Sequence, residues 1–530
     1  MLKMEGGGSR IVVSIISVFL AFLACASSYP ALQNFLQCLP INSNPSHPIS
    51  GAIYIPRNSS FESVLRAYTR NLRFTTLETP KPLAIITALH ESHVQATVIC
   101  AKSHGLQIRI RSGGHDYEGL SYVSKVPFVI LDMFNLRSID IDIAKETAWV
   151  QTGASLGELY YKIATTSKVH AFPAGVCLTV GTGGHFSGGG YGVMMRKYGL
   201  SVDNIIDAQI VNVNGRVLNR VSMGEDLFWA IRGGGGASFG VILSWKIKLV
   251  RIPPKVTMFN VPITSRQGAT DVVYRWQEVA PKLPGDLFIR ATISNANGII
   301  TATFRGLFLG QTDALLQLTN QSFPELNLTQ KDCKEMSWLN STLLWYEYPE
   351  GTSYEIFYNR TLTQGPENFY KGKSDYVKKV IPKESLEHIW KLVIKAGITF
   401  MQWNPYGGRM SEIPESETPF PHRAGNLFKI QYGMTWGLDN VTNARIEAIR
   451  ELYSAMTPYV SSEPREAFLN YRDLDIGKRS GFSKKKDLKE GGIYGVKYFK
   501  GNLRRLTKVK AVVDPDNFFV NEQSIPPSLY

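Results

Sequence analysis

Apolar positions in the first half of the chain recur at the spacings of short strands and short helices. Residues 83–87 are a short apolar run of strand length and residues 107–111 are the next predicted strand, and residues 91–102 between them repeat apolar side chains at helical spacing. A second helix is predicted after Ser155, because Ser155 and Glu158 form a capping-box pair. Further strands are predicted at residues 128–132, 148–152, 205–213 and 239–250.

Glycine marks the turns of this region. Asn214–Gly215, followed by a predicted strand at residues 216–221, indicates a hairpin with a type I′ turn. The glycine runs at residues 181–186 and 233–240 do not match the Gly-x-Gly-x-x-Gly pattern of a nicotinamide-type nucleotide site. Both runs are predicted to be tight turns.

The second half of the chain has a different pattern. Pro253 and Pro254 end a strand and indicate a domain boundary. The segments that follow predict an antiparallel sheet with one face covered by helices, and hence an α+β protein. Its predicted strands include residues 287–294 and 300–304, and its predicted helices include residues 273–279 and 387–394. The segment from residue 470 onward, with a helix near residues 503–509, is expected to return to the first domain.

The first residues resemble an export signal. Lys3 and Arg10 precede an apolar run at residues 11–24, which ends in small residues. This run is shorter than the about 20 residues of a membrane-spanning helix, so we expect a cleaved signal peptide at residues 1–26, no membrane span and secretion to the extracellular space or cell wall. Six sequons are compatible with glycosylation there, at Asn58, Asn320, Asn327, Asn340, Asn359 and Asn440.

The composition is that of a globular protein with a basic surface. The hydrophobic fraction of 44% argues against disorder, and the formal charge of +14 favours anionic partners. For a secreted protein this indicates an acidic cell-wall polysaccharide rather than nucleic acid. The basic run at residues 484–486 is interpreted as a solvated loop, and His90 with His93 as a helix cap or surface pair, since two histidines three residues apart do not form the metalloprotease zinc helix. No catalytic metal is expected.

Two glycine-rich stretches carry the candidate chemistry. Residues 111–117 contain His115 and residues 175–185 contain Cys177, and glycine lets each backbone approach a ligand closely. Taken singly, His115 fits a turn histidine and Cys177 a small buried hydrophobe. Together they fit two covalent anchors of one flavin, with histidine at the 8α methyl carbon and cysteine at the neighbouring C6.

The chain resembles the berberine bridge enzyme-like family of plant FAD-linked oxidases. The resemblance rests on five motifs, at residues 111–115, 177–185, 188–192, 226–233 and 494–517. It implies the vanillyl-alcohol-oxidase (PCMH-type) fold, with FAD held by His115 and Cys177. The FAD-binding domain is then residues 27–253, with its core at 78–253, the substrate-binding domain is residues 254–469, and residues 470–530 are the family's C-terminal segment.

The resemblance also implies the residues of the site. The expected catalytic residues are Tyr191, Tyr117, Tyr471, Lys429, Gln431 and Arg290, with Asn404 as a further candidate. The expected cofactor-binding residues, besides the two anchors, are Arg111, Ser112, Gly113, Gly114, Asp116, Ser121, Gly181, Thr182, Gly183, Gly184, His185, Ser187, Gly188, Gly192 and Asn502.

A tyrosine base needs a cation beside it. An isolated phenol has a pKa of about 10, and a neighbouring ammonium or guanidinium lowers it by stabilising the phenolate. Lys429 and Arg290 are expected to act in this way on Tyr191, which would take the proton of the substrate hydroxyl. Aromatic packing with a satisfied hydroxyl is the alternative for each tyrosine.

Three positions refine the expected activity. Alkaloid-cyclising relatives carry a glutamate base where this chain has Gln431, and an amide accepts no proton at physiological pH. Relatives with valine at Val180 tend to use oxygen, which favours an oxidase over a dehydrogenase. Leu178 departs from the proline often found beside the anchor cysteine, which affects the expected geometry of that loop.

The predicted function is therefore that of a secreted FAD oxidase. It would oxidise an alcohol or a sugar hemiacetal, from a cell-wall oligosaccharide or a monolignol-like compound, and pass the electrons to oxygen to give hydrogen peroxide. An alkaloid or terpenophenolic oxidase, and a wall-associated defence protein that acts mainly by binding, remain alternatives.

The cysteines fit export. Five are present, and Cys25 would leave with the signal peptide. If Cys177 holds the flavin, Cys38, Cys100 and Cys333 remain and one of them stays free. A Cys38–Cys100 disulfide is preferred, although the sequence alone does not fix the pairing.

Overall fold

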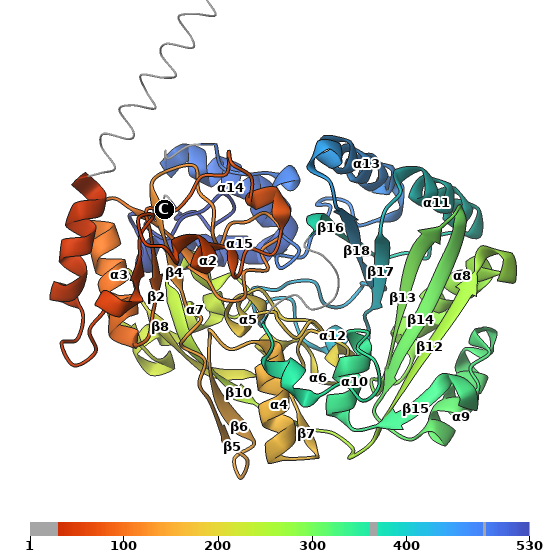
Figure 1. Ribbon diagram of the computed structural model, residues 1–530. Coiled ribbons are helices and arrows are strands. Elements are labelled where there is room, and N and C mark those ends of the chain that lie inside the picture. The colour runs from red at the N-terminus through yellow and green to blue at the C-terminus, as the bar shows by residue number, and fades with distance from the viewer. Residues whose placement is uncertain (1–29, 361–367, 481–483, 529–530) are drawn as a thin grey trace, which may run out of the picture.

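The computed structural model describes residues 30–360, 368–480 and 484–528. The predicted signal peptide at residues 1–26 lies outside the described residues. Two sheets and the helices around them form one half of the molecule, and a larger sheet with its own helices forms the other (Figure 1). None of the described helices is both long enough and apolar enough to cross a membrane.

A four-stranded sheet presents the first glycine-rich stretch. Its order is β1-β2-β4-β3, and β2, β3 and β4 are parallel. The helix α3 (Glu91–Ser103) connects β2 to β3, and the His90 side chain accepts a hydrogen bond from the backbone amide of Ser92, so this histidine caps the helix as expected. The strands are β1 (Ile53–Tyr54), β2 (Ala84–Thr87), β3 (Gln107–Arg111) and β4 (Phe128–Asp132).

A five-stranded antiparallel sheet with the order β5-β6-β10-β8-β9 supports the second stretch. The predicted capping box at Ser155 and Glu158 is present at the start of α4 (Leu156–Thr166). The strands are β5 (Ile139–Asp142), β6 (Thr147–Gln151), β8 (Ile205–Val211), β9 (Val217–Leu218) and β10 (Val241–Lys248). The other elements of this part are α2 (Phe61–Arg66), β7 (His170–Ala171), α6 (Met195–Tyr198) and β11 (Val250–Arg251).

The predicted hairpin is present, since β8 pairs with β9, but its turn type and the length of its second strand were wrong. Of the Asn214–Gly215 pair only Gly215 has a positive φ, of 74°, whereas a type I′ turn requires positive φ at both central residues. The backbone amide of Gly215 donates to the carbonyl of Asn212 instead. The second strand ends at Leu218, because Asn219 caps a helix, α7 (Arg220–Ile231).

Three other local predictions also need correction. The glycine run at residues 181–186 is not a tight turn, because α5 (Thr182–Ser187) begins after Gly181. The strand expected at residues 239–250 is split, since β10 ends at Lys248 and β11 pairs separately with β7. The basic run at residues 484–486 begins α14 (Lys484–Phe499) rather than forming a loop.

The expected antiparallel sheet has seven strands in the order β15-β12-β14-β13-β17-β18-β16. Its strands are β12 (Val256–Thr264), β13 (Leu287–Ala296), β14 (Ile299–Phe308), β15 (Cys333–Met336), β16 (Phe369–Val377), β17 (Phe400–Pro405) and β18 (Phe428–Trp436). The helices α8 (Ala269–Val279), α9 (Thr312–Ser322), α11 (Lys383–Ala396) and α13 (Thr442–Ala455) lie on its outer face (Figure 1). Two short helices, α10 (Trp338–Trp345) and α12 (Arg409–Glu412), lie nearer the first half.

Alternation along β13 shows how this sheet divides its two faces. Ala291 and Ile293 are fully buried in the core beneath the outer helices. Arg290, Thr292 and Ser294 point the opposite way and line a cavity between the two halves. The sheet therefore supplies a polar floor to that cavity.

The C-terminal segment packs on the first half. The Lys510 ammonium, in α15 (Leu503–Val513), donates to the backbone carbonyl of Ser238 over 2.6 Å and pairs with Asp514. The residues before these helices, 468–472, line the cavity. The chain thus passes from the first half to the large sheet and back.

The disulfide Cys38–Cys100 is present, and Cys177 and Cys333 are free thiols. We predict that replacing Cys38 and Cys100 together with serine lowers the free energy of unfolding by about 3–4 kcal/mol, because the bond restricts a long loop of the unfolded chain. Chemical denaturation would measure this loss, with Cys333→Ser as the control. A double variant no less stable than the control would contradict the prediction.

Of the six sequon asparagines, five are exposed, and Asn340 is half-buried with its side chain accepting a hydrogen bond from Tyr354. The exposed five, Asn58, Asn320, Asn327, Asn359 and Asn440, have the surface position that glycosylation requires.

Candidate functional site

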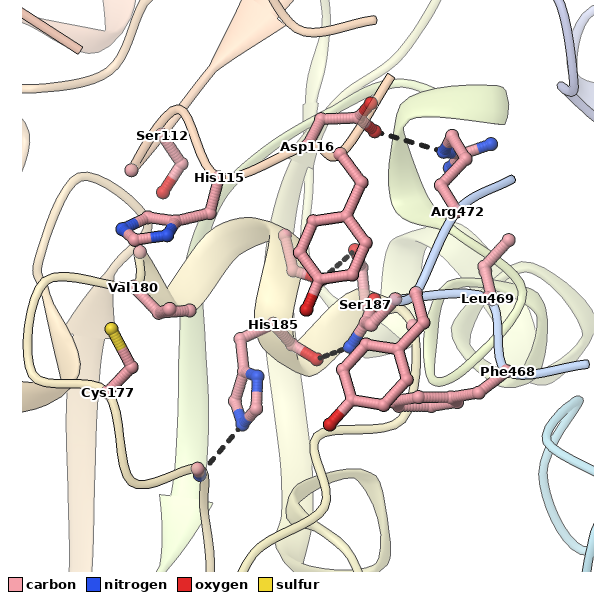
Figure 2. Close-up of a pocket in the computed structure, with 18 of the residues that line it drawn as sticks. Ser112, His115, Asp116, Cys177, Val180, His185, Ser187, Phe468, Leu469 and Arg472 are labelled. Carbon is pink, nitrogen blue, oxygen red and sulfur yellow. Dashed lines mark hydrogen bonds and ion pairs between the residues drawn. The ribbon is translucent and has the colours of Figure 1, made fainter. Parts of the chain in front are cut away.

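A cavity of about 940 Å³ lies between the glycine-rich stretches and the large sheet. This is near the upper end of the usual range for ligand sites. Its wall includes both glycine stretches and a C-terminal segment at residues 468–472 (Figure 2). The 233–240 run, five strands of the large sheet and residues 520–523 complete it. Segments more than 300 residues apart in sequence therefore meet at one site.

The two glycine stretches pack directly against each other. A Cβ atom on Gly113 would lie 2.3 Å from the backbone nitrogen of Gly181, and one on Gly114 would lie 1.8 Å from the carbonyl oxygen of Tyr68. Gly114 also has a φ of 69°, which favours glycine. Gly184 differs, because a Cβ there would meet no atom within 4 Å and the residue lines the cavity. These glycines allow close backbone contact on one side and leave room for a flat ligand on the other.

His115 and Cys177 lie on the same side of the cavity, one from each glycine stretch (Figure 2). The Nε2 atom of His115 is 3.0 Å from the Thr179 hydroxyl, and the Cys177 thiol donates to the Tyr346 hydroxyl over 3.4 Å. Burial, and then the charge of Arg70, lowers the pKa of His115 to about 3. The imidazole is therefore neutral at physiological pH, as a nucleophilic nitrogen must be.

His185 holds the second stretch in shape. Its Nε2 accepts a hydrogen bond from the backbone amide of Gly175 over 2.9 Å, and its carbonyl accepts one from the Asn470 side chain over 2.8 Å (Figure 2). Burial, and then the charge of Lys429, lowers the pKa of His185 to about 3, so the ring remains a neutral acceptor. This histidine ties the cavity wall to the C-terminal segment.

Most of the predicted cofactor-binding residues line the cavity, and three do not. Arg111 is buried beneath it in an ion pair with Asp132 at 2.6 Å. Thr182 is buried in α5, and its hydroxyl donates to the carbonyl of Gln151. The Asn502 side chain donates to the carbonyls of Glu415 and Thr418, away from the cavity. The lining residues are Ser112, Gly113, Gly114, His115, Asp116, Ser121, Cys177, Gly181, Gly183, Gly184, His185, Ser187, Gly188 and Gly192.

Tyr471 was predicted, but the rest of the C-terminal contribution to the wall was missed. Asn470, Asn521 and Gln523 line the cavity, but no glycine run or nucleophile marks them in the sequence. The motif at residues 494–517 led to the prediction of Asn502 as the C-terminal cofactor-binding residue instead. Only the return of the chain to the first half explains why these amides reach the site.

Tyr191 and Tyr471 form the centre of the predicted catalytic group. Their hydroxyl oxygens are 2.6 Å apart, and both side chains are more than nine-tenths buried. The Arg290 guanidinium donates to the Tyr191 hydroxyl over 3.4 Å and to the Asn404 side chain over 2.7 Å. Burial raises the pKa of Tyr471 well above its ordinary value, so Tyr471 stays protonated.

Lys429 lies behind the tyrosines rather than in the cavity wall. Its Nζ is 3.2 Å from the centre of the Tyr191 ring and also faces the rings of Phe468 and Tyr471. This buried nitrogen has no hydrogen-bond partner within the described residues. Burial, and then the charge of Arg290, lowers the pKa of Lys429 well below its ordinary value. Arg290 is therefore the permanent cation beside the Tyr191 hydroxyl.

Gln431 and Tyr117 form a second polar pair. The Gln431 amide donates to the Tyr117 hydroxyl over 2.7 Å, and both residues line the cavity. The Tyr117 and Tyr471 rings stack with centres 5.6 Å apart, and the Tyr370 ring meets Tyr117 edge-on at 4.7 Å. Burial raises the pKa of Tyr117 well above its ordinary value. All six predicted catalytic residues are thus gathered in one region.

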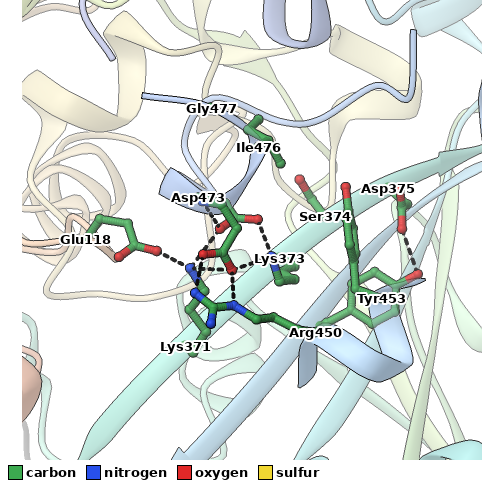
Figure 3. Close-up of polar contacts among 12 residues, drawn as sticks. Glu118, Lys371, Lys373, Ser374, Asp375, Arg450, Tyr453, Asp473, Ile476 and Gly477 are labelled. Carbon is green, nitrogen blue, oxygen red and sulfur yellow. Dashed lines mark hydrogen bonds and ion pairs between the residues drawn. The ribbon is translucent and has the colours of Figure 1, made fainter. Parts of the chain in front are cut away.

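A buried charge network includes Glu118, which follows Tyr117 in sequence, and Asp473, which lies two residues after Tyr471 (Figure 3). The Lys371 ammonium pairs with Glu118 and with Asp473, the latter at 2.7 Å, and Lys373 pairs with Asp473 at 2.7 Å. Burial alone would lower the pKa of Lys371, but Asp473, Glu118 and Asp475 raise it to about 12. The network joins the first half, the large sheet and the C-terminal segment.

Two features of the cavity fit a flavin dinucleotide. Arg472 lines it, and within the described residues its Nη1 and the Nε and Nη1 of Arg109 are buried without a hydrogen-bond partner. Guanidinium groups of this kind suit phosphate oxygens. The open glycine wall and the two nucleophilic side chains lie on the same cavity. Among the described residues, no group of three or more His, Cys, Asp or Glu side chains is arranged to hold a metal ion.

Comparison with known proteins agrees with this site. A family model described as an FAD binding domain matches residues 82–220, and one described as berberine and berberine like matches residues 467–526. Berberine bridge enzyme-like 4 of Arabidopsis thaliana is 57% identical over 519 residues, which are 96% of this chain and 97% of that protein. Berberine bridge enzyme-like 17 of the same plant is 55% identical over 527 residues, 98% of this chain and 99% of that protein.

Solved structures with the same fold are also similar. BBE-like #28 from Arabidopsis thaliana superimposes with a TM-score of 0.88 at 47% identity, covering 94% of this chain and all of that one. The Bermuda grass isoallergen BG60 gives a TM-score of 0.89 at 47% identity over 93% of this chain and all of that one. The chain belongs to the berberine bridge enzyme-like family of FAD-binding oxidoreductases.

Proposed function

We propose that this protein is a secreted oxidase that holds FAD through both His115 and Cys177 and oxidises an alcohol or sugar hemiacetal. The observation that carries the proposal is the position of the two anchors and of the Tyr191–Tyr471–Arg290 group on one cavity. The glycine walls would hold the isoalloxazine ring, and Arg472 and the C-terminal amides would hold the polar part of the cofactor. Bound FAD would accept the hydride of the donor carbon.

Side chains around the cavity can accept the proton of the substrate hydroxyl. Tyr191 takes the proton of the substrate hydroxyl, and Arg290 stabilises the negative charge on the Tyr191 oxygen because its guanidinium donates to that atom. Tyr471, which stays protonated, shares the same hydrogen bond and orients the Tyr191 hydroxyl. Tyr117 and Gln431 orient the donor by hydrogen bonding.

The polar floor of the cavity supports a carbohydrate or other hydroxylated substrate. Thr292, Ser294, Thr303 and Gln402 line it from neighbouring strands, with Trp345 and Phe400 as apolar surfaces. A 42% identical structural neighbour is described as a grass pollen allergen with glucose dehydrogenase activity. An isoleucine-to-valine variant of the same allergen is described as a glucose oxidase, and this chain has valine at position 180 of its second glycine stretch. The first description favours a sugar substrate, and the second favours oxygen as the electron acceptor.

The remaining parts of the proposal concern location. A predicted signal peptide, a disulfide and exposed sequons support export and glycosylation. The formal charge of +14 supports retention by acidic polysaccharides of the cell wall.

The alkaloid alternative is disfavoured by Gln431, whose amide donates to Tyr117 and is not available as a base.

An aerobic peroxide assay tests the proposal. We expect the purified yellow protein to release hydrogen peroxide with at least one of a monolignol, a neutral oligosaccharide or an oligogalacturonide. Peroxide released only with alkaloid amines would favour the alkaloid alternative. No turnover with any donor would favour a protein that acts by binding. In the same sample, the flavin is expected to remain with the acid-precipitated polypeptide.

A further inference from the structure

Thr179 lies between the two proposed flavin anchors. Its hydroxyl oxygen is 3.0 Å from the Nε2 atom of His115 and 3.6 Å from the sulfur of Cys177. The residue is 5% exposed, and it follows Cys177 by two positions in the second glycine stretch. One buried hydroxyl therefore contacts both nucleophiles.

The number of hydrogens on these groups limits the arrangement. A threonine hydroxyl has one hydrogen to donate and two lone pairs to accept with, and a neutral imidazole has one protonated nitrogen. When the hydroxyl hydrogen points to the Cys177 sulfur, the contact with His115 requires a proton on Nε2. The Nδ1 atom then carries the free lone pair. Tyr346 contacts the sulfur separately, because its hydroxyl accepts a hydrogen bond from the Cys177 thiol over 3.4 Å.

We propose that Thr179 is the positioning residue for attachment of the flavin to His115. By keeping Nε2 as a donor, it presents the unprotonated Nδ1 to the 8α methyl carbon. The inference rests on the covalent attachment proposed above and adds a positioning residue to it. In the overall balance, a bond forms between Nδ1 and the methyl carbon, one hydrogen leaves the methyl group and one leaves the imidazole. The two electrons released reduce the flavin, and dioxygen takes them with the two protons as hydrogen peroxide.

Cys177 is kept in every variant, because its sulfur is the acceptor for the Thr179 hydrogen. We expect Thr179→Val, which keeps the shape but removes the hydroxyl, to lower the fraction of flavin attached to His115 by about tenfold, the effect of losing one hydrogen bond. The measurement is mass spectrometry of the digested protein, which gives the fraction of His115 peptides that carry flavin whether or not Cys177 is also attached. Total FAD bound before digestion is measured on the same sample.

Two comparison variants make the test specific. Thr179→Ser keeps the hydroxyl and is expected to restore attachment. Thr97→Val removes another buried hydroxyl of the first half, which bonds within α3, and is expected to leave attachment unchanged. Attachment in Thr179→Val equal to that of its parent, failure of Thr179→Ser to restore it, or an equal loss in Thr97→Val would each overturn the inference.

Failure of the role proposed for Thr179 can be distinguished from failure of the proposed covalent attachment. If the protein with Cys177 and Thr179 intact leaves its flavin in the acid supernatant, the covalent attachment itself is wrong. If that protein keeps its flavin in the pellet while Thr179→Val behaves as its parent does, only the role of Thr179 is wrong.

Discussion

Replacing Tyr191 with phenylalanine is expected to slow reduction of the flavin by a substrate by about 10²- to 10⁴-fold, the usual contribution of a general base. Two predicted catalytic side chains contact the hydroxyl oxygen of Tyr191. It lies 2.6 Å from the Tyr471 hydroxyl oxygen and accepts a hydrogen bond from Arg290. Phenylalanine keeps the ring against which Lys429 packs, at 3.2 Å from Nζ to the ring centre. The change therefore removes the proton acceptor with little change to the packing.

Anaerobic stopped-flow absorbance would measure this rate, with the best donor from the peroxide assay. Flavin content and the flavin remaining after acid precipitation should equal those of the unmodified protein, because Tyr191 has no contact with His115 or Cys177 among the described hydrogen bonds. Tyr406→Phe is a matched control, since Tyr406 is buried and its hydroxyl donates to Tyr376. A reduction rate unchanged by Tyr191→Phe would exclude Tyr191 as the base.

The local pattern of the chain predicted the elements that carry the site. The helix at Glu91–Ser103 and the capping box at Ser155 appear where apolar spacing and capping residues place them, because these features depend on neighbours within one turn. The boundary at Pro254 is also local, and β12 begins two residues later at Val256. His115 and Cys177 were identified because each is a nucleophile within a glycine run.

The errors come from competition between local signals. Asn214–Gly215 suggested a type I′ turn, but the Asn212 carbonyl accepts from Gly215 and gives a different turn. The Asn219 cap then starts a helix where a strand was expected. The Asn214–Gly215 pair and the Asn219 cap are both visible in the sequence. Which of them determines the local structure depends on how the segment packs in the folded protein.

Contacts between distant segments were beyond the sequence pattern. Arg111 was expected at the cofactor, but its partner is Asp132 on the adjacent parallel strand β4. Lys371 bonds to Glu118 and Asp473, which are 253 and 102 residues away. Charged residues on a strand normally indicate a solvent-exposed face. Only the packing of the three segments against one another shows that Lys371, Glu118 and Asp473 are buried.

Replacing Lys371 with methionine is expected to lower the free energy of unfolding by about 3–5 kcal/mol, the usual loss when one partner of a buried ion pair is removed. Lys371 is 2% exposed, and its ammonium neutralises Glu118 and Asp473. Methionine fills the same volume but leaves those carboxylates with fewer positive partners in a buried site. Chemical denaturation of the flavin-loaded protein, followed by tryptophan fluorescence, would measure the loss.

The matched control is Lys395→Met, at a lysine whose side chain is 75% exposed and whose partner Glu451 is 3.5 Å away. Its removal should cost at most about 1 kcal/mol, because an exposed ion pair contributes little. A double variant, Lys371→Met with Glu118→Gln, should be more stable than the sum of the two single losses predicts, since it removes an unpaired buried charge. A Lys371→Met variant as stable as the Lys395→Met control would show that this network does not stabilise the contact between the first half, the large sheet and the C-terminal segment.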